Sequence, residues 1–154
     1  MSHVNMPSDV KTNGPTILTI GSFDGVHLGH QFLVSEVVEY SRRNNLQSVV
    51  LTFYPNPAVV LGRYSESTYI HRPDEKASLL MDMGVDWVVT MQFDHELAEI
   101  NAAEFVSHLR ETLDFRHLWC GENFAFGRNR EGDIKWLTQN ADSFGFELNV
   151  ANSV

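Results

Sequence analysis

The chain has 154 residues, which suits one domain of ordinary size, and 43% of them are hydrophobic, enough for a buried core. Its 20 Asp and Glu residues outnumber 11 Lys and Arg residues, and the net charge of −9 argues against nucleic acid or an anionic membrane as partner. No apolar run reaches the roughly 18 residues of a membrane span, and no signal peptide is visible. One cysteine, Cys120, cannot form an internal disulfide. We therefore expect a soluble, cytoplasmic protein, and the oligomeric state is left open.

The order of apolar runs along the chain indicates an α/β fold. Residues 1–15 lack periodicity and predict a flexible tail, followed by one domain over 16–154. Short apolar runs, typical of buried strands, cover 16–20, 48–53, 86–91, 116–121 and 146–151. Helical patterns alternate with them and cover 28–44, 73–83, 101–113 and 133–144. This alternation predicts a Rossmann-like three-layer α/β/α fold with a parallel sheet of about five strands.

Unusual residues concentrate where four of these predicted strands end. In parallel sheets, ligands bind beyond the carboxyl ends of the strands. Those ends here are residues 21–24, 54–57, 92–94 and 121–124. Topology and composition therefore predict a site at the same edge of the sheet.

The strongest motif is the sequence GSFDGVHLGH, residues 21–30, between the first predicted strand and the first predicted helix. Its glycines permit tight turns and a close approach of the backbone to a ligand, and the N-terminus of the following helix suits a phosphate. His27 and His30 are three residues apart, so both rings share one face of the first helical turn. Two imidazoles placed there can donate hydrogen bonds to a phosphate whose charge grows during a reaction. The loop does not match GxGxxG, a P-loop or a zinc peptidase.

The motif GSFDGVHLGH resembles the HxGH motif of the α/β nucleotidyltransferase superfamily, in the form found in the adenylyltransferase module of bacterial bifunctional FAD synthetases. The resemblance continues through LTFYPNP (51–57), FDHELAEINAAEFV (93–106) and CGENFAFGRNREGD (120–133). The last of these segments narrows the resemblance from the superfamily to the flavin enzymes. Together these segments extend the likeness over residues 16–151, nearly the whole chain.

The resemblance implies transfer of AMP from ATP to FMN, giving FAD and pyrophosphate without a covalent enzyme intermediate. It makes His27 and His30 the catalytic residues that hold the ATP phosphates. Asp24 is open to two interpretations, as a turn or cap residue or as a contact with the ligand or Mg²⁺. The residues expected to bind the nucleotide are Gly21, Ser22, Phe23, Asp24, Gly25, Gly29 and Asn56.

The segment GENFAFG offers groups that suit a flavin. The amide of Asn123 can donate and accept hydrogen bonds, and aromatic rings favour stacking with a flavin or an adenine. We expect one of Phe124 and Phe126 to lie in the core, and we predict that Asn123 and Phe126 contact the ligand. Arg128 either attracts an anionic substrate or belongs to a solvated loop. No carboxylate cage for a metal is evident, so we expect Mg²⁺ to enter with ATP, held mainly by its phosphates.

The sequence departs from the family pattern at three points. Asn56 stands where the family usually has a histidine between two prolines, and Asn cannot carry a positive charge. The sequence ends before the family's Ser-Ser-Thr-x-Ile-Arg segment, and a riboflavin kinase module is absent from it. Three interpretations follow: an adenylyltransferase with reduced activity from a short or truncated chain, a nucleotide- or flavin-binding module without turnover, or a transferase acting on another phosphate ester. The intact HxGH loop favours the first.

Overall fold

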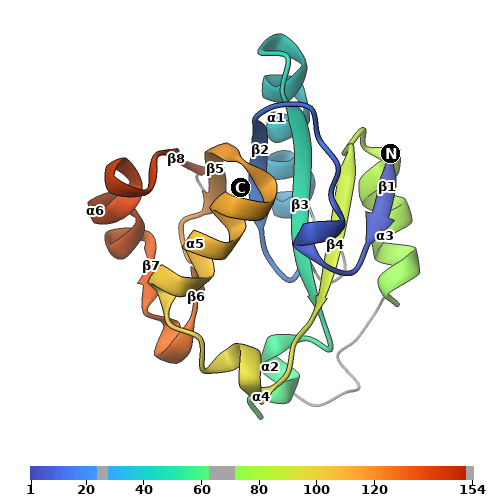
Figure 1. Cartoon of the computed structure of the whole chain (residues 1–154). Helices are drawn as coiled ribbons and strands as arrows, with labels where there is room; N and C mark the ends of the chain where they lie inside the picture. The colour runs from blue at the N-terminus through green and yellow to red at the C-terminus, as the bar shows by residue number, and fades with distance from the viewer. Residues whose placement is uncertain (24–27, 63–71, 152–154) are drawn as a thin grey trace.

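The computed structural model describes residues 1–23, 28–62 and 72–151. A six-stranded sheet forms its centre, and every neighbouring pair of its strands is parallel (Figure 1). In spatial order the strands are β1 (Ser2–Val4), β4 (Trp87–Gln92), β3 (Gln47–Tyr54), β2 (Thr16–Ile20), β5 (Phe115–Gly121) and β8 (Glu147–Ala151). A separate antiparallel pair, β6 (Ala125–Phe126) and β7 (Gly132–Asp133), follows β5 in the chain.

Helices cover both faces of the sheet, so its central strands β2 and β3 are buried over most of their length. All five residues of β2 are buried. On one face, α1 (Leu28–Arg43) and α3 (Pro73–Asp82) pack against Ile17, Val50 and Val88. On the other face, α5 (Ala102–Leu113) and α6 (Ile134–Phe144) pack against the next residues along the same strands, such as Leu18 and Val89. Because successive side chains of a strand point to opposite faces, a strand buried on both sides is apolar without alternation.

The predicted three-layer α/β architecture is confirmed, and its five predicted strands are present. The sixth strand, β1, corrects the prediction that residues 1–15 form a flexible tail. β1 pairs with β4 along the edge of the sheet, and His3 Nε2 lies 2.8 Å from Thr90 Oγ1. A short 3₁₀ turn (Pro7–Asp9) follows, and Val10 is buried in the core. Backbone pairing with an otherwise open edge orders this segment, which has no apolar period of its own.

The helix ends follow the capping signals of the sequence. Asn101 accepts a hydrogen bond from the backbone N–H of Glu104 at 2.8 Å, which caps α5 as its spacing predicts. Asp133 caps α6 in the same way through the N–H of Trp136, and Gly145 ends that helix with φ of 83°. None of the helices in the described residues combines the length and apolarity that crossing a bilayer requires.

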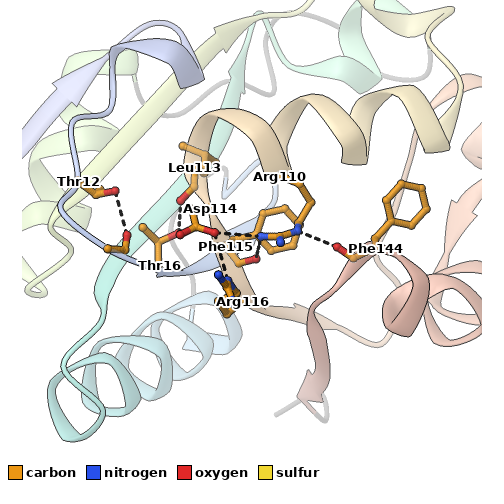
Figure 2. Close-up of polar contacts among 9 residues, drawn as sticks. Thr12, Thr16, Arg110, Leu113, Asp114, Phe115, Arg116 and Phe144 are labelled. Carbon is orange, nitrogen blue, oxygen red and sulfur yellow. Dashed lines mark hydrogen bonds and ion pairs between the residues drawn. The ribbon is translucent and has the colours of Figure 1, made fainter.

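Arg110 joins three elements on the α5 side of the sheet (Figure 2). Its Nε donates to the carbonyl oxygen of Phe144 at 2.7 Å, at the end of α6. Its Nη1 donates to the carbonyl oxygen of Phe115 at 2.6 Å, at the start of β5, and its guanidinium lies 5.6 Å from the centre of the Phe115 ring. One side chain therefore fixes how α5, β5 and α6 meet.

Replacing Arg110 with Leu is expected to lower the free energy of unfolding by about 2 kcal/mol or more, because two backbone carbonyls lose a charged donor. Arg116→Leu is the matched control. Arg116 is 55% exposed, and its Nε lies 3.1 Å from Asp114 Oδ1. An exposed ion pair of this kind contributes at most about 1 kcal/mol. Urea denaturation measures both values. Equal losses in the two variants would contradict the role given to Arg110.

Candidate functional site

A cavity of about 980 Å³ opens at the carboxyl edge of the sheet. Most of its lining comes from four segments that are distant in sequence and lie at or just beyond the ends of four strands, which are residues 20–23 at β2, 53–57 at β3, 93–100 at β4 and 121–130 at β5. The helix α1 adds His30 and Leu33. Two short helices, α2 (Pro57–Val60) and α4 (His95–Ala98), lie together at this edge in Figure 1. The predicted location of the site is therefore the location of the cavity. Its size is at the upper end of the ~300–1,000 Å³ typical of small-molecule sites.

The loop after β2 is held in a defined conformation. The N–H of Gly21 donates to the carbonyl oxygen of Leu51 at 3.0 Å, and the ring of Phe23 packs so closely that a β-carbon on Gly21 would lie 3.0 Å from it. Phe23 has φ of 50° and is only 2% exposed. A left-handed conformation in a non-glycine residue persists only where its surroundings impose it. Phe23 is thus an anchor of this loop, and its backbone and ring edge contribute to the cavity wall.

The carbonyl oxygen of Ser22 accepts two hydrogen bonds from other elements. Thr52 Oγ1 on β3 donates to it at 3.0 Å, and Lys76 Nζ on α3 donates to it at 2.7 Å. Both donors are buried, Thr52 at 1% and Lys76 at 3% exposed. The backbone at Ser22 is therefore fixed from two directions.

The structure brings most of the residues predicted to bind the nucleotide to this cavity. His30, on the first turn of α1, lines the cavity, and its ring meets the ring of Phe23 edge-on at 5.1 Å between centroids. Asn56 lines the cavity from the start of α2. Gly29 lies within α1. The predictions for Asp24, Gly25 and His27 fall outside the described residues.

The predicted flavin residues line the same cavity. Asn123, Phe126 and Arg128 all contribute to it. Phe126 is only 8% exposed and packs against Phe105 and Trp136, whereas Phe124 is the more exposed ring and stacks on Phe126 at 5.6 Å. One ring of the pair thus belongs to the core, and it is Phe126.

The loop that carries Arg128 is fastened to the start of α5. The N–H of Arg128 donates to the carbonyl oxygen of Ile100 at 3.0 Å, and Glu131 Oε1 accepts a hydrogen bond from the N–H of Ala102 at 2.8 Å. Gly127 has φ of 80°, and a β-carbon there would lie 3.2 Å from the backbone nitrogen of Ala102. Only glycine fits this close approach without strain. The two walls formed by 97–100 and 127–130 are therefore one connected unit.

Two kinds of site residue escaped the sequence analysis. The first is the wall from α4 and its following turn, with Leu97, Glu99 and Ile100. These residues lie in the 93–106 segment that carries the family resemblance, but the sequence analysis assigned none of them to the site. The second is Lys76, a lysine within a helical pattern, which ordinarily indicates an exposed side chain. In the part of the chain that the structure describes, no group of three or more His, Cys, Asp or Glu side chains is placed to hold a metal ion.

The fold and the position of the cavity define a Rossmann-like α/β protein with a cavity at the carboxyl edge of its sheet, where such folds bind ligands. A family model described as FAD synthetase matches residues 9–154. The chain therefore belongs to the FAD synthetase family.

Curated relatives agree with this family, and a solved structure shares the fold. The chain is 36% identical over 133 residues to the bifunctional riboflavin kinase/FMN adenylyltransferase of Escherichia coli K12, covering 86% of this chain and 42% of that protein. It is 30% identical over 151 residues to the protein of the same name from Listeria monocytogenes, covering 97% and 48%. The chain thus spans less than half the length of these two relatives. The crystal structure of a macrolide-efflux protein from Streptococcus pneumoniae matches 99% of this chain and 50% of that chain with a TM-score of 0.80 and 23% identity, a likeness of fold.

Replacing Glu131 with Ala is expected to loosen the loop at 127–131, because the N–H of Ala102 loses its acceptor. Such a hydrogen bond contributes about 1 kcal/mol to the stability of the local structure. Trypsin cleavage after Arg128 and Arg130 measures this, and we expect it to become about fivefold faster. Glu111→Ala, an exposed change on α5, is the control and is expected to leave the rate unchanged. An unchanged rate in Glu131→Ala would show that the contact does not hold the loop.

Cys120 is fully buried and directly precedes the loop at residues 121–130. Desolvation raises the pKa of its thiol from 9.0 to about 12. At pH 8 the folded protein then has roughly a thousandfold less thiolate than a free cysteine. We expect no reaction with Ellman's reagent in native buffer and one full equivalent in urea. Rapid reaction of the folded protein would contradict the burial of Cys120 in the core.

Proposed function

We propose that this chain transfers AMP from ATP to FMN, releasing pyrophosphate and forming FAD. The main observation in support of this activity is that the Gly21–Phe23 loop and the 121–130 loop line one cavity. The first loop belongs to the motif that resembles a nucleotidyltransferase, and the second to the segment that resembles the flavin enzymes. Family membership and the name FMN adenylyltransferase carried by its relatives support the same activity.

The reaction needs positioning and charge stabilisation from the protein. An oxygen of the FMN phosphate attacks the α-phosphorus of ATP, the bond from that phosphorus to the bridging oxygen of the β-phosphate breaks, and pyrophosphate leaves with the electron pair. Holding both substrates in one cavity makes the attack effectively intramolecular. Fixed donors aimed at the growing charge then lower the barrier.

The ATP side of the cavity is formed by the β2–α1 connection. We assign the phosphates to the first turn of α1, where His30 lines the cavity and the helix N-terminus favours anions. The backbone at Gly21 and Ser22 and the amide of Asn56 border the same space. His27, Asp24, Gly25 and Gly29 retain the roles that the family resemblance implies.

The flavin side is formed by the loop after β5. Asn123 offers its amide to the polar edge of a flavin ring, and Arg128 offers a positive charge to the FMN phosphate. Phe124 is the ring better exposed for stacking, with Phe126 behind it. The ligand contact that the sequence predicts for Phe126 is thus shared between Phe124 and Phe126.

The described residues do not by themselves form a metal site. We therefore propose that Mg²⁺ arrives as the magnesium complex of ATP, with the triphosphate as its main ligand. The protein's own contribution is then the set of donors around the phosphates.

Incubating the purified chain with ATP, Mg²⁺ and FMN tests the proposal, with FAD and pyrophosphate measured by chromatography. We expect equal amounts of the two products. His30→Ala is expected to lower kcat/KM by about 100-fold, the usual effect of removing a donor to the transition state. His108→Ala, an exposed histidine on α5, is the matched control and is expected to keep wild-type activity.

The result that contradicts the proposal is binding of ATP or FMN without FAD formation by the wild-type chain. That result favours the binding module over the enzyme. Turnover with another phosphate ester but not with FMN favours a different transferase of the same fold.

A further inference from the structure

Lys76 is a buried charge beside the cavity. It is 3% exposed, and its Nζ donates to the carbonyl oxygen of Ser22 at 2.7 Å, a distance typical of a charge-assisted hydrogen bond. Lys76 itself does not line the cavity. It reaches the site through the backbone at Ser22.

Lys76 lies in a mostly apolar setting. It belongs to the first turns of α3, which begins at Pro73, and its neighbours Ala77 and Leu80 are buried. A buried ammonium group needs polar partners to compensate the loss of water. The carbonyl oxygen of Ser22 is one such partner, and this contact joins α3 to the loop after β2.

The contact fixes the backbone from which the nucleotide loop is built. With donors from both Thr52 and Lys76, both lone pairs of the Ser22 carbonyl oxygen are engaged. Because C=O and N–H point in opposite directions across a trans peptide, the two donors also set the direction of the Phe23 N–H. The same donors help to hold the left-handed conformation of Phe23, whose ring contacts the ring of His30.

We propose that Lys76 is a positioning residue for the triphosphate. Its ammonium group holds the Ser22–Phe23 backbone in the shape that accepts ATP phosphates. This inference rests on the proposed function for the identity of its nucleotide. It predicts an effect on ATP and none on FMN, because the flavin wall comes from other elements.

Lys76→Met removes the charge and keeps the length of the side chain. We measure ATP binding calorimetrically in the presence of Mg²⁺ and without FMN, FMN binding separately, and unfolding by urea. The dissociation constant for ATP is expected to rise about tenfold or more, while that for FMN stays within about twofold. Lys11→Met, an exposed lysine in the N-terminal segment, removes the same charge and is expected to leave ATP binding unchanged.

Lys76→Arg provides a rescue, because it returns a charged donor to the Ser22 carbonyl and is expected to recover most of the ATP affinity. If Lys76→Met lowers stability but binds ATP as the wild type does, Lys76 only holds the fold and the inference is wrong. An equal loss of FMN binding also overturns it. Should Lys76→Met fail to fold, Thr52→Val removes the other donor. Weaker ATP binding in Thr52→Val then supports the inference, and unchanged binding contradicts it.

Two failures remain distinguishable. A wild-type chain that binds ATP but forms no FAD refutes the proposed function and leaves the titration of Lys76→Met to decide this inference. A wild-type chain that binds no ATP refutes both.

Discussion

The site depends on the parallel alignment of three adjacent strands. Leu18 of β2 is in register with Val49 of β3 on one side and with Leu118 of β5 on the other. All three strands run in the same direction, so the segments that follow them leave the sheet at one edge. Residues distant in sequence, such as Ser22, Asn56 and Asn123, therefore border one cavity. Strand order, rather than any single side chain, brings the loop after β2 and the loop after β5 together.

The walls of this cavity differ in how they are held. The loop after β2 is fixed by buried groups, with the ring of Phe23 in the core and two donors on the Ser22 carbonyl oxygen. The loop after β5 is fixed at its far end through backbone contacts with the start of α5, while Arg128 remains exposed. Under the proposed function, the buried contacts at Ser22 and Phe23 border the phosphates, and the exposed Arg128 borders the FMN.

Much of the fold could be predicted because its strands are buried on both faces and read as apolar runs. The edge strand β1 could not, since Ser2 and His3 carry no apolar signal and the strand forms only through backbone pairing with β4. The edge of the sheet that holds the site followed from the ends of the predicted strands. Which of Phe124 and Phe126 lies in the core could not be predicted, because two aromatic residues at alternate positions are equivalent until the packing of α5 and α6 is known. Lys76 was hidden for a similar reason, as only its tertiary contact with Ser22 distinguishes it from an exposed helical lysine.

The central claim is that one cavity holds both substrates side by side. A crystal structure of the chain with FMN and a non-hydrolysable ATP analogue measures this directly. The account predicts the triphosphate at the first turn of α1, the flavin ring against Phe124, and the FMN phosphate facing the α-phosphorus. Either ligand bound away from this cavity, or the two held apart so that their phosphates cannot meet, would contradict it.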